Sequence, residues 1–203
     1  SLFLRGELLR SLGRLHLMVG QFRESEQTLD ESLASFRGFG DPHSEAATLV
    51  DLGRLALARS DLGHAETMLE EALATFRQFG EPRSEAIILR ELGVLYHARG
   101  ELARAETTVH EALAIFRHVG DPRNEAAALR DLGTLYRARG ELARAETMLE
   151  EALAAFRRFG EPRSEAIILS DLGSLYRERG ELARAETTLQ EALVAFRRLG
   201  DLH

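Results

Sequence analysis

The side chains that could carry chemistry in this chain are arginines, carboxylates and a few histidines, because the sequence contains neither cysteine nor lysine. All 26 lysine-or-arginine positions are therefore arginine. The lack of lysine excludes P-loop phosphate binding and Schiff-base chemistry, and the lack of cysteine excludes disulfides, thiolate nucleophiles and cysteine-ligated metals. Exclusive use of arginine is typical of a GC-rich bacterial genome, and a cysteine-free chain suits the reducing cytoplasm, where we expect this protein.

The histidines and carboxylates do not form a recognisable catalytic or metal site. No two of the seven histidines have the i, i+4 spacing of a helical metal pair. The carboxylates recur periodically, and a catalytic pair needs two different environments that separate its pKa values. We therefore predict no enzymatic activity, no metal and no cofactor within these residues. The recurrence is clearest at Glu66, Glu106, Glu146 and Glu186.

A repeat of forty residues governs the whole sequence. The dipeptide Leu-Gly recurs without insertion or deletion at Leu12-Gly13, Leu52-Gly53, Leu92-Gly93, Leu132-Gly133 and Leu172-Gly173. Such self-similarity is the signature of a stacked repeat architecture. We predict one solenoid domain over residues 1–203, with repeats 1–40, 41–80, 81–120, 121–160 and 161–200.

Each repeat carries two amphipathic helical patterns separated by a glycine. In the repeat 81–120, the apolar spacing of three and four residues predicts one helix before Gly100 and another after it. Gly120, Asp121 and Pro122 then provide a helix stop, an N-cap and a suitable first-turn residue. The first apolar stripe is Leu89, Leu92, Leu95 and Tyr96, and the second is Leu102, Ala105, Val109, Ala112, Leu113 and Phe116.

A glycine in the middle of every first helix needs a structural reason, since glycine there costs about 0.5–1 kcal/mol relative to alanine. We expect Gly93 and its equivalents to allow close approach of the second helix, with Ala105 and Ala112 as its small partners. The phenylalanines and the tyrosines Tyr96, Tyr136 and Tyr176 are predicted to lie in the core. Arg99, Arg104 and their equivalents are expected to make structural contacts.

These residues resemble the tetratricopeptide repeat. Leu89, Leu92-Gly93, Tyr96, Gly100, Ala105 and Ala112 match its signature at the family spacing. The forty-residue unit is similar to the variety found in Pins-type adaptors, kinesin light chains and bacterial STAND-class regulators. The resemblance implies an all-α, right-handed α-solenoid of five helix-turn-helix repeats with ten antiparallel helices. It also implies a protein-interaction scaffold.

Residues that differ between repeats mark a candidate partner site. Positions kept in all repeats serve the scaffold, and the variable positions of the first helix fall on one stripe at spacings of four and three. The resemblance implies that this stripe lines a concave groove. Because arginine can grip carboxylates with two bonds, we expect an acidic peptide or protein segment with some apolar anchors. The predicted partner-binding residues are Arg10, Arg14, Leu17, Val50, Arg54, Leu57, Arg90, Val94, His97, Arg130, Thr134, Arg137, Ser174 and Arg177.

An alternative explanation of this stripe stays open. The arginines could instead pair with the carboxylates one position along the stripe and form a solvated face of mixed charge, where exposed pairs contribute about 0–1 kcal/mol. Those carboxylates are Asp51, Glu91, Asp131 and Asp171.

Net charge and hydropathy restrict the class of partner. A net charge of −7 and an isoelectric point near 5.6 disfavour nucleic-acid binding. No apolar run is long enough to span a bilayer, so no membrane partner is expected. We predict a scaffold within a larger bacterial signalling or regulatory protein. The alternatives are a small-molecule sensor of a STAND-class regulator, and self-assembly through uncapped terminal helices.

The ends of the array lack the capping helix that solenoids normally carry. The last helix exposes an apolar stripe with nothing following to cover it, so we expect either a fragment of a longer chain or association between copies. This stripe comprises Leu189, Leu193, Phe196 and Leu199.

Overall fold

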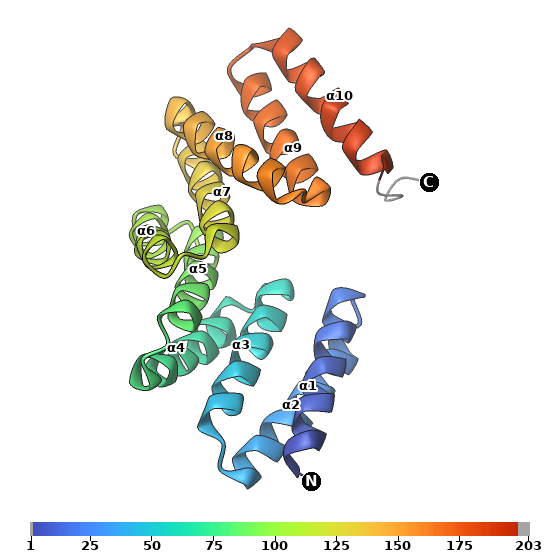
Figure 1. Ribbon diagram of the computed structural model, residues 1–203, viewed down its shortest axis with the longest axis vertical. Helices are drawn as coiled ribbons and strands as arrows, with labels where there is room; N and C mark the ends of the chain where they lie inside the picture. Colours follow the sequence, from blue (N-terminus) through green and yellow to red (C-terminus); the bar gives the residue numbers. More distant parts are fainter. Residues whose placement is uncertain (1, 199–203) are drawn as a thin grey trace. The chain divides into compact units, whose positions relative to one another are not determined.

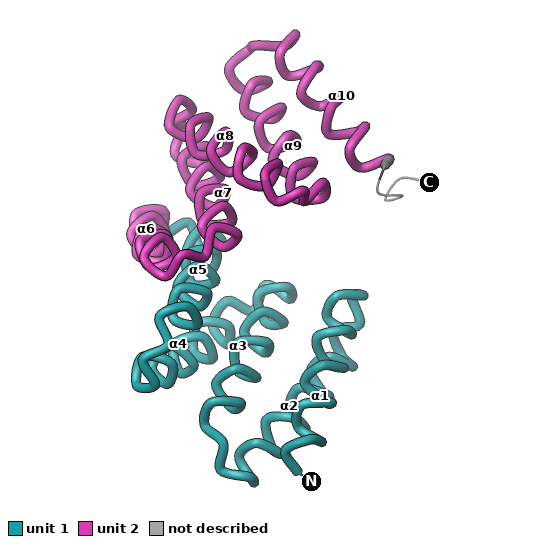
Figure 2. Tube along the Cα trace, viewed as in Figure 1, with its two compact units in different colours: residues 1–101 teal, residues 102–203 magenta. Residues whose placement is uncertain are grey.

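The computed structural model describes residues 2–198, and all secondary structure in this range is α-helical (Figure 1). The chain forms two compact units, residues 1–101 and 102–203 (Figure 2). Unit 1 contains α1 (Leu2–Met18), α2 (Phe22–Phe39), α3 (Pro42–Ala58), α4 (Leu62–Phe79) and α5 (Pro82–Ala98). Unit 2 contains α6 (Leu102–Val119), α7 (Pro122–Ala138), α8 (Leu142–Phe159), α9 (Pro162–Glu178) and α10 (Leu182–Arg198).

Each helix packs on its neighbour in sequence within its unit. In unit 1 this holds for α1 with α2, α2 with α3, α3 with α4 and α4 with α5, while α1 and α5 also touch α3. Unit 2 shows the same order from α6 to α10. The helices have 17 or 18 residues. The boundary between the units falls inside the repeat 81–120, so the single domain stays a prediction.

The helix boundaries follow the predicted Gly-acid-Pro sequence. Asp41 caps α3 by accepting a hydrogen bond from the Ser44 amide at 3.2 Å, and Asp121 caps α7 in the same way. Glu81 holds the equivalent position but does not cap its helix, because its longer carboxylate accepts from the Ser84 hydroxyl instead. The preceding glycines adopt left-handed φ values of +63° to +76°, at Gly40, Gly80, Gly120 and Gly160.

The mid-helix glycines do allow close helix approach. A Cβ atom on Gly53 would lie 2.9 Å from Leu69 Cγ, and one on Gly133 would lie 2.7 Å from Leu149 Cγ. The side chain that fills the space is thus leucine, and the backbone carbonyl oxygen of Ala65 would lie 3.6 Å from the same Cβ atom on Gly53. The predicted close approach is confirmed at Gly53 and Gly133, where the nearest side chain is a leucine rather than one of the expected alanines.

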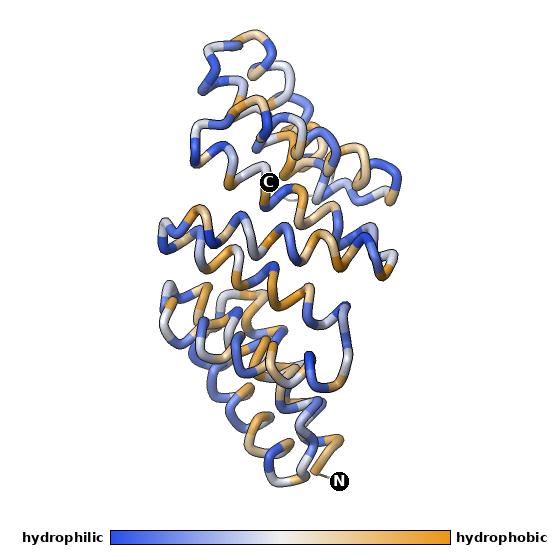
Figure 3. The backbone as a smooth tube through the Cα atoms, turned by 90° about the vertical axis from the view of Figure 1, so that its left-hand side faces the viewer, coloured by the Kyte–Doolittle hydropathy of each residue, from blue (hydrophilic) through white to orange (hydrophobic). Residues whose placement is uncertain are grey.

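Each unit buries its own apolar side chains between first and second helices. Hydrophobic and hydrophilic residues alternate along the helices at short intervals, as amphipathic packing requires (Figure 3). The tyrosines Tyr96, Tyr136 and Tyr176 are 1–3 % exposed, which confirms their predicted place in the core. Other buried side chains include Leu29, Phe36, Leu69, Phe76, Phe116, Leu149 and Phe156. The prediction that the phenylalanines lie in the core is wrong for Phe3, Phe22, Phe39, Phe79 and Phe159, which are 37–56 % exposed.

The outer helices expose apolar side chains. On α1, Leu4 and Leu8 are 61 % and 71 % exposed, and on α10 Leu193 is 44 % exposed. Phe196 is half-buried, and Leu199 lies outside the described residues. Among residues 2–198, no helix combines the length and the apolar character needed to cross a membrane.

Candidate partner-binding site

The first helices of the repeats carry every residue of the predicted site. In unit 1 the residues lie on α1 (Arg10, Arg14, Leu17), α3 (Val50, Arg54, Leu57) and α5 (Arg90, Val94, His97). In unit 2 they lie on α7 (Arg130, Thr134, Arg137) and α9 (Ser174, Arg177). The two groups belong to separate units.

Four of the predicted residues surround one hollow in unit 1. This first-helix hollow has a volume of about 250 Å³ and is lined by Arg10, Arg14, Val50 and Arg54, together with Ile87 of α5. Val50 is only 7 % exposed, so it forms part of the floor and does not project as an anchor. The hollow therefore combines an arginine rim with an apolar base, as expected for a site that takes a carboxylate and an apolar side chain.

A buried carboxylate organises the arginine rim. The side chain of Asp51 is 3 % exposed and accepts a hydrogen bond from Arg10 Nε at 2.8 Å, while Arg54 Nη1 lies 3.3 Å from its other oxygen. Arg54 Nε also reaches Glu91 at 3.1 Å. These bonds hold two guanidinium groups in defined positions, which lowers the conformational entropy that a partner would have to remove.

Arg14 is held much less tightly than its neighbours. Its Nε lies 3.9 Å from Asp51 Oδ1, at the limit of an ion pair, and its side chain is 58 % exposed. Arg10 and Arg54 are 23 % and 34 % exposed. Arg14 is consequently the arginine of this rim best able to turn its guanidinium toward an incoming carboxylate.

The structure also contains ion pairs between the arginines of the stripe and nearby carboxylates, as the alternative explanation of the stripe predicts. Arg10 and Arg130 each bond the aspartate of the following repeat, Asp51 and Asp171, at 2.8 and 2.9 Å. Arg90 instead contacts the adjacent Glu91 at 3.2 Å. The pairing thus connects consecutive repeats as well as neighbouring residues.

In unit 2, several side chains of the predicted stripe form contacts within the unit itself. Besides the Arg130–Asp171 bond, Thr134 donates its hydroxyl to the Arg130 carbonyl oxygen at 3.2 Å. Arg137 lies 3.9 Å from Glu178. Arg177 is exposed, and Ser174 is half-buried. The unit 2 hollows beside Pro162 and beside Gly140 are lined by other residues, whereas the unit 1 hollow is lined by four predicted ones, so unit 1 is the stronger candidate.

The arginines expected to be structural do make repeating scaffold contacts. The guanidinium of Arg144 stacks 3.9 Å from the ring centre of Tyr136, and Arg184 stacks 4.0 Å from that of Tyr176. Burial, together with the negative charge of Glu146, raises the pKa of Tyr176 to about 12. A second series of ion pairs joins Arg59, Arg99, Arg139 and Arg179 to Glu26, Glu66, Glu106 and Glu146. Within residues 2–198, no cluster of three histidines or carboxylates could hold a metal ion.

Some lining residues of the first-helix hollow escaped the sequence analysis. His43 and Ala47 of α3 and Phe76 of α4 also line it. His43 and Ala47 precede Val50 by seven and three residues, so they continue the same helical stripe toward the N-terminus. Both positions also vary between repeats, and extending the comparison by two turns would have found them.

Comparison with known proteins supports the predicted fold. The tetratricopeptide repeat profile matches residues 4–78, 84–158 and 125–198. A search of curated proteins finds no match. The structure of BtubC (BKLC) from P. vanneervenii is similar with a TM-score of 0.80 and 24% identity, covering 100% of this chain and 84% of that one.

Two regulators also share the fold. The STAND protein PH0952 from Pyrococcus horikoshii, which has a tetratricopeptide repeat sensor, gives a TM-score of 0.78 at 18% identity over 93% of this chain and 29% of that one. The Rap conjugation gene regulator of plasmid pLS20, in complex with the Phr* peptide, gives 0.76 at 14% identity, covering 98% and 64%. The predicted α-solenoid of five helix pairs is confirmed, and the chain belongs to the tetratricopeptide repeat family.

Proposed function

We propose that this chain is a protein-interaction scaffold whose first-helix hollow binds an acidic segment of a partner protein. The observation that carries the proposal is the convergence of Arg10, Arg14 and Arg54 on a hollow with an apolar floor. The lining contains these three arginines and a single carboxylate, Asp51, so a negatively charged partner is favoured there. The wider role is that of a region in a larger bacterial signalling or regulatory protein.

The three arginines play different parts in this proposal. Arg10 and Arg54 are fixed by Asp51 and present a preformed positive edge. Arg14 supplies the two-bond grip on a carboxylate, because its exposed guanidinium can reorient. An apolar side chain of the partner, placed next to the carboxylate, contacts Ile87 and Val50 below. The peptide complex of the Rap regulator supports a peptide partner, since it shows that a protein of this fold takes one.

A library of displayed peptides tests the proposal. Selection on the unaltered protein is expected to enrich acidic sequences that contain an apolar residue. Arg14→Glu should weaken the selected peptides about tenfold or more, since it removes an attraction and adds a repulsion, and tenfold corresponds to about 1.4 kcal/mol. Arg23→Glu, on the exposed face of α2 in the same unit, is the matched control with equal net charge. Peptides that bind Arg14→Glu as well as the unaltered protein would refute the site.

A small-molecule sensor is the second candidate, favoured by the sensor array of PH0952. Ligand sites usually enclose about 300–1,000 Å³. The first-helix hollow, at about 250 Å³, is smaller and suits one or two side chains better. A thermal-shift screen separates the two functions: stabilisation by a metabolite, together with no peptide selected from the library, would support the sensor.

A further inference from the structure

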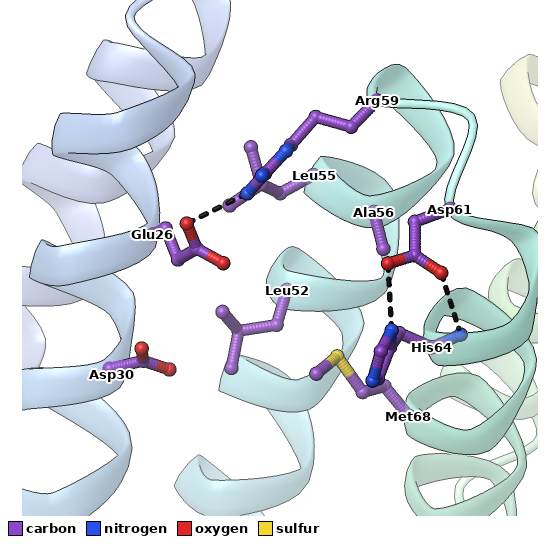
Figure 4. A pocket seen from close by; sticks show the side chains of 9 residues that line it. All are labelled: Glu26, Asp30, Leu52, Leu55, Ala56, Arg59, Asp61, His64 and Met68. Carbon is purple, nitrogen blue, oxygen red and sulfur yellow. Dashed lines mark hydrogen bonds and ion pairs between the residues drawn. The ribbon is translucent and has the colours of Figure 1, made fainter.

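A second hollow in unit 1 lies away from the arginine rim. This Ala56 pocket has a volume of about 160 Å³ and is formed by α2, α3 and α4. Figure 4 shows Glu26 and Asp30 of α2 on one side, His64 and Met68 of α4 on the other, and Ala56 of α3 between them. It shares no lining residue with the first-helix hollow.

The equivalent position in a later repeat shows which kind of side chain fills the space that is open in the Ala56 pocket. Two repeats later in the sequence, the position of Ala56 is held by Tyr136. That tyrosine is 1 % exposed, and its hydroxyl donates to Glu106 at 3.0 Å. Arg144 stacks on its ring at 3.9 Å. In unit 2, a phenol ring therefore fills the place that is hollow in unit 1.

The surroundings of the two places are largely the same. Glu26 and Arg59 form an ion pair at 2.7 Å in unit 1, and Glu106 and Arg139 form the equivalent pair in unit 2. The Glu26 side chain is 49 % exposed, whereas that of Glu106 is 20 % exposed under its tyrosine. Unit 1 thus keeps a carboxylate, that of Glu26, which could accept a hydrogen bond from a phenol hydroxyl, but no aromatic ring covers it. Leu52, Leu55 and Met68 also have identical counterparts, namely Leu132, Leu135 and Met148.

The Ala56 pocket also differs in charge from the equivalent place two repeats later. His64 stands where Arg144 stands two repeats later, and it bonds Asp61 at 2.7 Å. Three carboxylates of the lining, on Glu26, Asp30 and Asp61, then face one guanidinium, that of Arg59. Burial and the nearby negative charge of Glu26 raise the pKa of Asp30. The lining of the pocket consequently carries more carboxylates than guanidinium groups, and it lacks an aromatic ring.

We propose that the Ala56 pocket binds a tyrosine side chain of a partner protein segment that carries a positive charge next to that tyrosine. The ring lies over Leu52 and Leu55, the hydroxyl donates to Glu26 as that of Tyr136 does to Glu106, and the cation lies near Asp30 and Asp61. The size agrees, because a cavity of about 150 Å³ accommodates a benzene ring.

Methyl NMR of the methionines tests this proposal with internal controls. The sequence has three methionines: Met68 lines the pocket, Met148 has the filled counterpart, and Met18 is exposed on α1. With ¹³C-methyl methionine, p-cresol should shift the Met68 signal through the ring current and leave Met148 and Met18 in place. Tyramine should bind about two- to fivefold more tightly than p-cresol, as expected for one exposed ion pair, and 4-hydroxyphenylacetate more weakly.

The segment itself is tested with two blocked tetrapeptides, Gly-Tyr-Arg-Gly and Gly-Phe-Arg-Gly. The tyrosine peptide should shift Met68 at lower concentration than the phenylalanine peptide, because only the phenol donates to Glu26. Binding of p-cresol without any binding of the tyrosine peptide would overturn the partner segment in favour of a free small phenol.

Two variants complete the test. Ala56→Tyr should abolish the Met68 shift by filling the pocket, with Ala56→Leu as a smaller filler if the first variant does not fold. Tyr136→Ala should open the equivalent space and transfer sensitivity to p-cresol onto Met148. The proposal fails if Met68 does not move with millimolar p-cresol or tyramine, or if it moves equally in the filled variants.

Discussion

Two equivalent ion pairs allow the strength of the contact between the arginine rim and Asp51 to be measured as a coupling free energy. Arg10–Asp51 in unit 1 and Arg130–Asp171 in unit 2 join corresponding positions, with Nε–Oδ2 distances of 2.8 and 2.9 Å. Their burial differs, since the arginine and aspartate side chains are 23 % and 3 % exposed in the first pair but 39 % and 23 % in the second. The bonded atoms have similar geometry, so a difference in coupling energy reports the different surroundings of the two pairs, namely the deeper burial of Asp51 and the additional arginines Arg54 and Arg14 beside it.

The expected magnitudes follow from these exposures. Hydrogen bonds to charged groups contribute about 1.5–3 kcal/mol when shielded, and exposed pairs contribute about 0.2–1 kcal/mol. Because Arg10 keeps part of its side chain in water, we expect a coupling of about 1.5–2 kcal/mol for Arg10–Asp51. The Arg130–Asp171 pair should couple by about 0.5–1 kcal/mol.

Double-mutant cycles measure both couplings. Arg10→Met, Asp51→Asn and the double variant form one cycle, and Arg130→Met with Asp171→Asn forms the other, each followed by urea unfolding monitored through helix content. Repeat arrays can unfold in steps, so only variants with unchanged m-values enter the comparison. Equal couplings, or a larger coupling in unit 2, would refute the assignment of Asp51 as the buried organiser of the rim.

Further stability predictions concern the repeat scaffold. Gly133→Ala should destabilise the chain by about 1–2 kcal/mol, because overpacking against Leu149 outweighs the gain in helix propensity; Gly63→Ala, where a Cβ meets nothing closer than 4.0 Å, should instead stabilise by about 0.5–1 kcal/mol. Both are measured by urea unfolding, and equal effects would contradict the close-approach explanation. Ala56→Tyr should stabilise by about 1 kcal/mol through burial of its ring, and a loss of stability would show that the ring does not fit. The pKa of Tyr176, raised to about 12 in the folded chain from 10.0, means that its stabilising contribution is complete below pH 10 and is lost as the pH rises toward 12; unfolding across this range should show a decline that Tyr176→Phe reduces.

The sequence predicts the fold well because the residues that meet each structural requirement recur in several repeats. The left-handed glycine at position 40 and the Asp41 cap follow from local turn chemistry, and Gly53 follows from its recurrence in the middle of a helix. The finer assignment of contacts was less predictable. Whether Leu69 or Ala65 fills the space beside Gly53 depends on side-chain direction across two helices, which spacing alone does not fix.

The candidate site was only partly predictable for a related reason. Variation between repeats pointed to Arg10, Arg14 and Arg54, and these do line one hollow. The variation between repeats could not distinguish Arg10, which is held by an ion pair, from the more exposed Arg14. That difference arises from the burial of Asp51 in the next repeat. The same comparison contained the substitution of tyrosine by Ala56, but a missing side chain becomes a pocket only once the packing around it is known.

The central claim, that an acidic segment binds at the first-helix hollow, is tested most directly by the isoleucine methyl spectrum. Ile87 and Ile88 line this hollow, whereas Ile167 and Ile168 hold the same positions two repeats later in unit 2. Titration with a selected acidic peptide should shift the δ1-methyl signals of Ile87 and Ile88 and leave those of Ile167 and Ile168 unchanged, and Arg14→Glu should remove the shift. Binding without any change at Ile87 and Ile88, or with equal changes at Ile167 and Ile168, would contradict the claim.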